Sequence, residues 1–140
     1  MNWLGWALLS ALFAGITAVL AKVGVAGVDS NLATAIRTTV ILLFAWAIAL
    51  LTARPAELTG LPGRTWLFLM LSGIATGLSW LCYFRALQLG QASQVAPVDK
   101  LSVVFVLLFA ALFLREPVTL RSGLGSLLIV AGAIVLAWKR

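Results

Sequence analysis

Five apolar stretches occupy almost the whole chain, and each is long enough to cross a bilayer. The expected spans cover residues 3–22, 31–52, 65–87, 93–114 and 119–138. A helix that rises about 1.5 Å per residue needs about 20 residues to cross a hydrocarbon core roughly 30 Å thick. The sequence therefore predicts an all-α, polytopic membrane protein with five transmembrane helices, in one domain over residues 1–140. Because five is odd, the two ends of the chain are expected on opposite sides of the membrane.

The composition leaves no room for a soluble domain beside these spans. Hydrophobic residues make up 63% of the chain and charged residues 10%, whereas a soluble domain is usually about a quarter charged. A very apolar soluble helical bundle is therefore the disfavoured alternative. The net charge of +6 comes from basic residues that stand one or two at a time near span ends. This spacing indicates membrane anchoring and contact with lipid, and argues against nucleic-acid binding.

The sequence offers little reactive chemistry. Cys82 is the single cysteine and there is no histidine, so neither an intrachain disulfide nor a metal cluster is expected. No nucleophile elbow, phosphate-binding loop or pair of carboxylates is visible. We therefore expect no enzyme activity, no catalytic residues and no cofactor. The N-terminus lacks a basic segment before its apolar stretch, so the first span is expected to be retained.

Local signals mark where two spans begin and where the longest loop lies. Ser30 or Asn31 could cap the second helix, and Thr119 could cap the fifth, because short polar side chains accept hydrogen bonds from free helix N–H groups. Residues 53–64 contain two prolines and two glycines and are expected to form the longest polar loop.

The basic residues do not assign one orientation clearly. The first face is expected to hold Lys22, Arg37, Arg85, Lys100, Lys139 and Arg140, and the second Arg54, Arg64, Arg115 and Arg121. The simple count favours a cytoplasmic C-terminus. Removing the four basic residues that lie within spans on the first face reverses the count. Two alternatives remain open: a single orientation with the C-terminus inside, or insertion in both orientations.

Small residues on two spans are suited to close helix contacts in lipid. The third span carries Gly73 and Gly77 in a GxxxG spacing. Gly125 and Gly132 lie seven residues apart in the fifth span, so they share one helix face. We predict a dimer interface at Gly125 and Gly132; packing within the monomer is the alternative.

Five ionisable residues fall inside spans: Lys22, Arg37, Arg85, Asp99 and Lys100. A charge at the centre of a span costs roughly 2.5–3.5 kcal/mol on insertion scales, so such residues tend to be paired or functional. The alternatives are long basic side chains that reach back to the interface, and a purely structural ion pair.

The Asp99–Lys100 pair is the sharper signal. It follows Pro97, which disturbs a helix, and transporter sites are often built where spanning helices are broken. Adjacent side chains point about 100° apart, so Asp99 is expected to pair with Lys22 or Arg37 from another span. A polar pocket with aromatic walls is expected there, for an anionic or zwitterionic ligand. The predicted substrate-binding residues are Lys22, Arg37, Trp80, Tyr83, Arg85, Asp99 and Lys100.

Several motifs, in their order along the chain, resemble the EamA domain of the drug/metabolite transporter superfamily. They are Lys22 at the end of the first span, SNLATAIR at 30–37, LCYFRAL at 81–87, VAPVDKLS at 95–102, and Arg115-Glu116 before a glycine-rich last span. The resemblance covers essentially the whole chain. Most members of this family contain two inverted five-helix repeats, whereas this chain is similar to the bacterial subgroup that has one.

The resemblance implies one half of a ten-helix, inverted-repeat transporter, completed as an antiparallel homodimer. It implies secondary transport, in the direction of export, of a small-molecule substrate across the inner (plasma) membrane. Small multidrug exporters of the superfamily dimerise through a last-helix glycine pair spaced like Gly125 and Gly132. They also carry an acidic residue in span one that this chain lacks, which disfavours export of cationic drugs. A flippase subunit and a non-transporting subunit of a larger complex are the alternatives.

Overall fold

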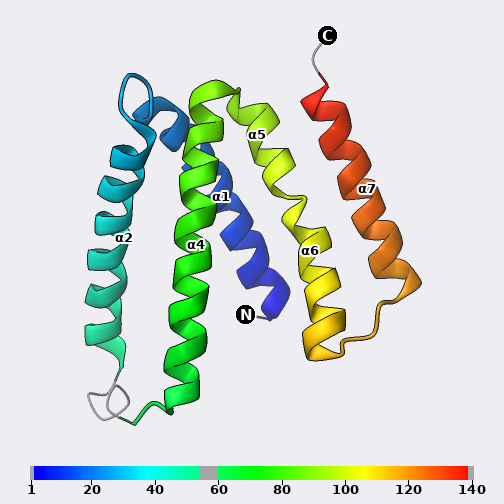
Figure 1. Ribbon diagram of the computed structural model, residues 1–140, viewed down its shortest axis with the longest axis horizontal. Coiled ribbons are helices and arrows are strands. Elements are labelled where there is room, and N and C mark those ends of the chain that lie inside the picture. Colours follow the sequence, from blue (N-terminus) through cyan, green and yellow to red (C-terminus); the bar gives the residue numbers. More distant parts are fainter. Residues whose placement is uncertain (1, 54–59, 139–140) are drawn as a thin grey trace. The chain divides into compact units, whose positions relative to one another are not determined.

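The computed structural model describes residues 2–53 and 60–138, and every regular element within these ranges is helical (Figure 1). Five helical segments are long and apolar enough to span a membrane. The prediction of an all-α, five-span protein is thus confirmed. The elements are α1 (Trp3–Gly24), α2 (Ser30–Thr52), α4 (Gly63–Leu89), α5 (Ala92–Asp99), α6 (Ser102–Phe109), η1 (Ala110–Leu114) and α7 (Leu120–Ala137).

Observed and expected span ends agree to within two residues. The fourth span, Ala92–Leu114, is the one that is not a single uniform helix, because it contains α5, α6 and the π-helical turn η1 in sequence. Half of the expected loop over residues 53–64, residues 54–59, lies outside the described residues, as do the basic residues Arg54, Lys139 and Arg140.

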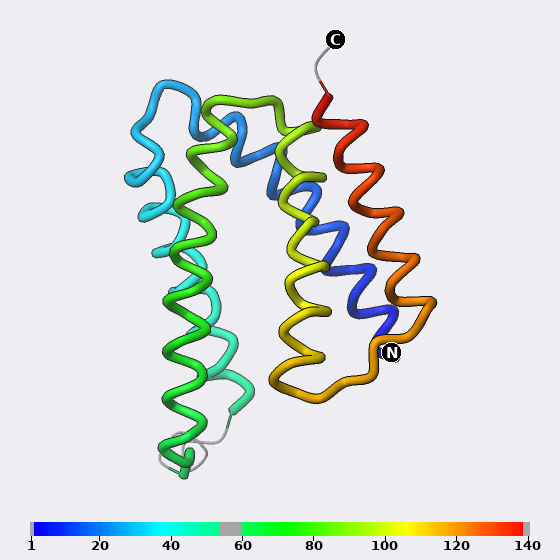
Figure 2. The backbone as a smooth tube through the Cα atoms, turned by 45° about the vertical axis from the view of Figure 1, so that its right-hand side comes forward, coloured from blue at the N-terminus to red at the C-terminus, as the bar shows by residue number. Residues whose placement is uncertain are grey.

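The chain separates into two compact units, and a single domain stays a prediction. One unit, Val23–Gln88, contains α2 and α4, which run antiparallel (Figure 1). The other combines most of α1 with α5, α6, η1 and α7. Within this second unit α7 packs along α5 and also contacts α6, as Figure 2 shows from a second direction.

The second span begins with a different cap from the expected one. The Oδ1 atom of Asp29 accepts hydrogen bonds from the backbone N–H groups of Asn31 (2.9 Å) and Leu32 (3.0 Å). Ser30 and Asn31, the predicted caps, lie inside the first turn of α2. A carboxylate suits this position because it also interacts favourably with the positive end of the helix dipole.

The predicted cap of the fifth span is confirmed. Thr119 Oγ1 accepts from the backbone N–H of Ser122 (3.2 Å), and the Thr119 N–H donates to Ser122 Oγ (3.0 Å). This reciprocal capping box satisfies two N–H groups that the helix itself cannot.

Threonine hydroxyls within the spans donate to their own helix. Each hydroxyl reaches the carbonyl oxygen four residues earlier, at distances of 2.7–3.0 Å. Such a bond removes the cost of an unpaired hydroxyl in hydrocarbon, where no water is available. The residues are Thr34, Thr38, Thr39, Thr52 and Thr76.

The fourth span tightens into a 3₁₀ stretch immediately after Asp99. The N–H of Lys100 donates to the Pro97 carbonyl (3.1 Å), and that of Leu101 donates to the Val98 carbonyl (3.0 Å). Pro97 has no N–H, and its ring crowds the carbonyl four residues earlier. The predicted disturbance of this span near Pro97 is therefore confirmed, and a mid-span 3₁₀ stretch often marks a hinge.

Replacement of Asp29 by alanine is expected to lower the free energy of unfolding by about 1 kcal/mol, because two N–H groups at the start of α2 lose their acceptor. The measurement is loss of helical circular dichroism as SDS is titrated into protein in mixed micelles. Asp29→Asn is the matched control, since asparagine keeps the accepting oxygen. Equal stability of the alanine and asparagine variants would contradict the capping role.

Candidate functional site

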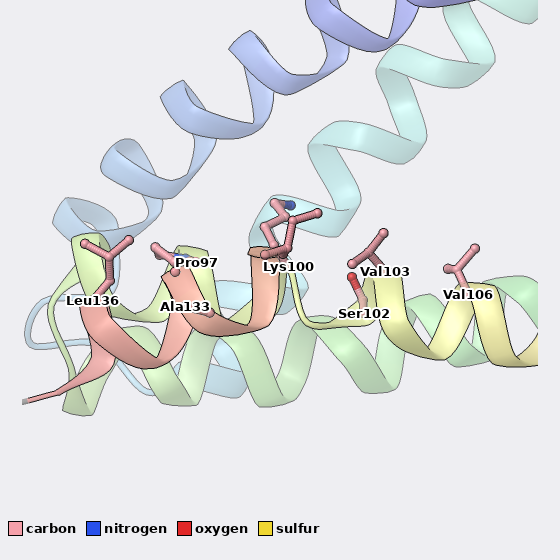
Figure 3. Close-up of a pocket in the computed structure, with 9 residues that line it drawn as sticks. Pro97, Lys100, Ser102, Val103, Val106, Ala133 and Leu136 are labelled. Atoms are coloured by element: carbon pink, nitrogen blue, oxygen red, sulfur yellow. The ribbon is translucent and has the colours of Figure 1, made fainter. Parts of the chain in front are cut away.

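A groove of about 650 Å³ lies between the interrupted fourth span and α7, entirely within one compact unit (Figure 3). Its walls are almost wholly aliphatic, and Lys100 and Ser102 supply its polar side chains. The lining residues are Pro97, Lys100, Ser102, Val103, Val106, Ile129, Gly132, Ala133 and Leu136.

The helix geometry explains this lining. In a 3₁₀ stretch residues three apart eclipse one another, so Pro97, Lys100 and Val103 line up on one side of the span. On α7 the lining positions follow the spacing of one α-helical face; they are Ile129, Gly132, Ala133 and Leu136. The interruption after Asp99 therefore brings a charged residue to the wall of an otherwise apolar groove.

Asp99 pairs with its neighbour in the sequence. Its Oδ2 atom lies 3.5 Å from Lys100 Nζ, with the Lys100 side chain 62% exposed and that of Asp99 38% exposed. The expectation that adjacent residues point too far apart to pair is therefore wrong. A lysine has a flexible four-carbon stem, and this stem bends the ammonium group back toward the carboxylate.

Lys22 is anchored elsewhere in the same unit. Its Nζ donates to the carbonyl oxygen of Gly90 at 2.8 Å, which ties the end of α1 to the connection before α5. The sequence suggested that Asp99 pairs with Lys22. In the structure, Asp99 forms its ion pair with Lys100.

Arg37 forms an aromatic cluster in the unit of α2 and α4. Its guanidinium carbon lies 4.3 Å from the ring centroid of Trp80 and 5.5 Å from that of Phe84. We call Arg37, Trp80 and Phe84 the arginine cradle. Trp80 and Phe84 are four residues apart on α4, so both rings belong to one helix face.

Aromatic contact only partly offsets the cost of this charge. Arg37 lies seven residues after Ser30, or roughly 10 Å into α2. A cation over an aromatic face gains about 0.5–2 kcal/mol, against roughly 2.5–3.5 kcal/mol for a charge at the centre of a span. An anion bound beside Arg37 would therefore stabilise the arginine cradle further.

Sequence reasoning named Trp80 and Tyr83 but missed Phe84. Phe84 is 3% exposed, and its ring meets that of Tyr83 edge-on at a centroid distance of 6.5 Å. The spacing of four between Trp80 and Phe84 was the available signal, because it identifies neighbours on a helix surface.

Arg85 belongs to a different contact. Its Nη1 donates to Gln88 Oε1 at 2.8 Å, and Gln88 Nε2 in turn donates to the Val28 carbonyl at 2.5 Å. This relay joins the end of α4 to the turn before α2. Gln88 was not predicted, and no sequence pattern distinguishes it. The relay gives Arg85 a positioning role, and direct substrate contact by Arg85 stays a prediction.

The glycines predicted to make helix contacts face open space in the part of the chain that the structure describes. A side-chain carbon added at Gly73, Gly77, Gly125 or Gly132 would meet no heavy atom within 4 Å beyond its own helix. Each glycine therefore has room for a neighbouring helix beside it within its own unit, and the dimer interface at Gly125 and Gly132 stays a prediction.

Within each of its two units the structure brings some of the predicted site residues together. Lys100 lines the groove beside Asp99, Arg37 and Trp80 form the cradle, and Arg85 joins the Gln88 relay. No three metal-ligating side chains gather anywhere in residues 2–53 and 60–138. A pocket shared by all seven predicted residues stays a prediction.

Comparison with known proteins gives several relatives. One is an uncharacterized transporter from the cobO 3′ region of Sinorhizobium sp., 57% identical over 97% of this chain and 96% of its own. Two are described as probable 4-amino-4-deoxy-L-arabinose-phosphoundecaprenol flippase subunits ArnE. The Enterobacter sp. (strain 638) protein is 37% identical over 52% of this chain and 68% of its own. The Erwinia tasmaniensis protein is 37% identical over 53% and 70%.

No solved structure matches this chain. The EamA-like transporter family matches residues 1–138, nearly the whole sequence. Transporter relatives and five membrane-length helices together point to transport across a membrane, and away from enzyme catalysis. The chain is a multi-pass membrane protein that belongs to the EamA-like transporter family.

Proposed function

We propose that the chain is a secondary transporter of the inner membrane. It exports a small anionic or zwitterionic metabolite by alternating access, and it works as an antiparallel homodimer. The proposal follows the family, and it rests on one structural observation above the others: the fourth span is interrupted beside the pair Asp99–Lys100.

The interruption supports transport because it combines a hinge with charge inside a span. Non-helical backbone at membrane depth is tolerated where it is buried in protein or lines a cavity, and Lys100 lines the groove at this point. Broken helices near the middle of the membrane form the substrate and ion sites of many secondary transporters. The 3₁₀ stretch at Lys100 and the charged pair beside it support a site of this kind in the fourth span.

Asp99 is the proposed carrier of a coupling proton. Among the acidic residues that the structure describes, Asp29 caps α2 and Glu116 follows η1, whereas Asp99 lies within a span. An anionic substrate at Lys100 would compete with Asp99 for the ammonium group that now pairs with it. One charged pair would thus couple substrate binding to protonation.

The open glycine faces support assembly with a second copy. Lipid-embedded helices associate through small residues that let backbones approach closely, and Gly125 and Gly132 lie on one face of α7 with free space beside them. Two five-span copies inserted in opposite directions would give an inverted pair of ten helices. The ambiguous distribution of basic residues is consistent with such dual insertion.

A flippase subunit is the second candidate. Two relatives are described as subunits of a flippase for a lipid-linked sugar, and the groove is almost wholly apolar, as a site for a lipid chain would be. In this role the chain would assemble with a different partner instead of with itself. Co-purification of a second membrane protein at a fixed ratio would favour this candidate.

Orientation is tested with two reporters fused after Arg140, one active only in the cytoplasm and the other only outside it. Comparable activity from both is expected, because the basic residues favour neither orientation strongly. Activity of one reporter alone would exclude the antiparallel homodimer. The control is a fusion to a membrane protein of known single orientation, expressed at the same level.

Bulky substitutions at both Gly125 and Gly132 are expected to convert the dimer to a monomer. Leucine at these positions fills the space that a neighbouring backbone would need. The measurement is cross-linking in native membranes followed by size-exclusion chromatography. Leu127→Phe is the matched control, since it adds bulk two residues from Gly125, on the other side of α7. Unchanged dimerisation of the double variant would reject this interface.

The Asp99→Asn variant is expected to lose proton-driven uptake into liposomes, because asparagine cannot bind or release the coupling proton. Uptake of radiolabelled carboxylates is measured with and without an imposed pH gradient. Glu116→Gln, which removes a carboxylate outside the helices, is expected to retain uptake. Full gradient-driven uptake by a well-expressed Asp99→Asn variant would remove Asp99 from the mechanism.

A further inference from the structure

We infer that the arginine cradle is a recognition site for anions with a flat apolar body, such as aromatic carboxylates, and that it rejects zwitterions and amines. The inference rests on the proposed transport function and narrows its substrate class. It is carried by the stacking of Arg37 on Trp80 at 4.3 Å, with Phe84 at 5.5 Å.

The stacked geometry determines which groups of Arg37 remain available. A guanidinium is planar, and its N–H donors point outward in that plane. The guanidinium carbon of Arg37 lies over the Trp80 ring, and in the arrangement that we propose the ring covers one face of the guanidinium while the edge donors bind the ligand. The edge presents two parallel N–H groups that match the two oxygens of a carboxylate or phosphate.

The surroundings of Arg37 select against a positive charge on the ligand. In the unit that contains Arg37, Asp29 is the acidic residue that the structure describes. Its Oδ1 atom is used as the cap of α2, and it lies eight residues from Arg37, roughly 12 Å along the helix. A zwitterion or an amine would thus bring an ammonium group to a site for which the described part of its own unit offers no carboxylate beyond the capping Asp29.

The aromatic residues select for shape. Trp80 and Tyr83 are partly exposed, whereas Phe84 is buried behind them. Planar apolar groups stack on such faces, and offset or edge-on arrangements are favourable. A benzoate-like ligand could place its carboxylate against the Arg37 edge and its ring beside the aromatic side chains. A saturated ring of the same size offers no comparable stacking.

The chain itself provides a matched control for this chemistry. Arg64 lies over Phe68, with its guanidinium carbon 5.7 Å from the ring centroid, near the opposite end of α4. It is the same type of contact, made within the first turns of one helix and outside the cradle. Trp66 likewise provides a control for Trp80.

The test measures binding of radiolabelled benzoate to the full-length protein in phosphatidylcholine nanodiscs. Cyclohexanecarboxylate is expected to compete more weakly than unlabelled benzoate, while phenylalanine and benzylamine are expected not to compete. Arg37→Lys should weaken benzoate binding by about tenfold, since lysine keeps the charge but loses the two-pronged edge. Arg64→Lys should leave it unchanged.

Trp80→Leu provides a second variant that retains Arg37. In this variant the affinity for benzoate is expected to fall to that for cyclohexanecarboxylate. In the Trp66→Leu variant benzoate is expected to keep its higher affinity. Both tryptophan variants are compared with the unmodified protein by circular dichroism, so that loss of fold is recognised separately.

Four results of the binding measurements would overturn the inference. They are equal competition by phenylalanine or benzylamine, unchanged benzoate binding by a folded Arg37→Lys variant, absence of benzoate binding, and loss of binding when phosphatidylglycerol replaces phosphatidylcholine. The last result would assign the cradle to the headgroup of an anionic lipid. Uptake of a zwitterion into liposomes, unaffected by Arg37→Lys, would overturn the cradle inference while leaving the transport function intact.

Discussion

Hydrocarbon offers no hydrogen-bond partner, and the structure of this chain depends on that constraint. Every span is helical because a helix satisfies its own backbone, and the threonine hydroxyls of α2 and α4 donate to carbonyls of their own helix for the same reason. The interruption after Asp99 respects the constraint as well. There the N–H groups shift to carbonyls three residues away instead of four, so the span changes its winding without losing its bonds.

Charge inside the spans is handled in two ways. At Asp99 and Lys100 opposite charges lie side by side and form a pair with no net charge. At Arg37 the charge rests against the electron-rich faces of Trp80 and Phe84. The first arrangement balances charge completely, and the second does so only in part. Of the two groups, the cradle therefore has the stronger remaining attraction for an anion.

Much of the architecture could be predicted because it follows from periodicity and length. The five spans, the Thr119 cap and the disturbance near Pro97 each depend on residues close together in the sequence. The side chain that makes a particular contact could not be predicted in the same way. Asp29 replaced Ser30 or Asn31 as the cap because all three are good candidates within two positions, and only the backbone angles decide between them.

The side-chain contacts of the candidate site were harder still to predict from the sequence. Pairing between Asp99 and Lys100 depends on how far a flexible stem bends, which helix geometry alone does not determine. The relay through Gln88 could not be predicted, because its second bond goes to a carbonyl sixty residues away in the sequence. Trp80 could be suspected from its position near the middle of the third span, and Phe84 was recoverable from its spacing to Trp80.

The Asp99–Lys100 pair carries no net charge whereas Arg37 carries one, so the membrane potential acts differently on the two groups. Moving one elementary charge through the full potential involves about 2.3 kcal/mol per 100 mV. Asp99 and Lys100 would cross such a field together at little cost, since their charges cancel. Arg37 has no such companion among the described residues of its unit beyond the capping Asp29. Any motion that displaces it along the membrane normal is electrogenic when the cradle is empty, and becomes electrically silent when a single negative charge occupies it.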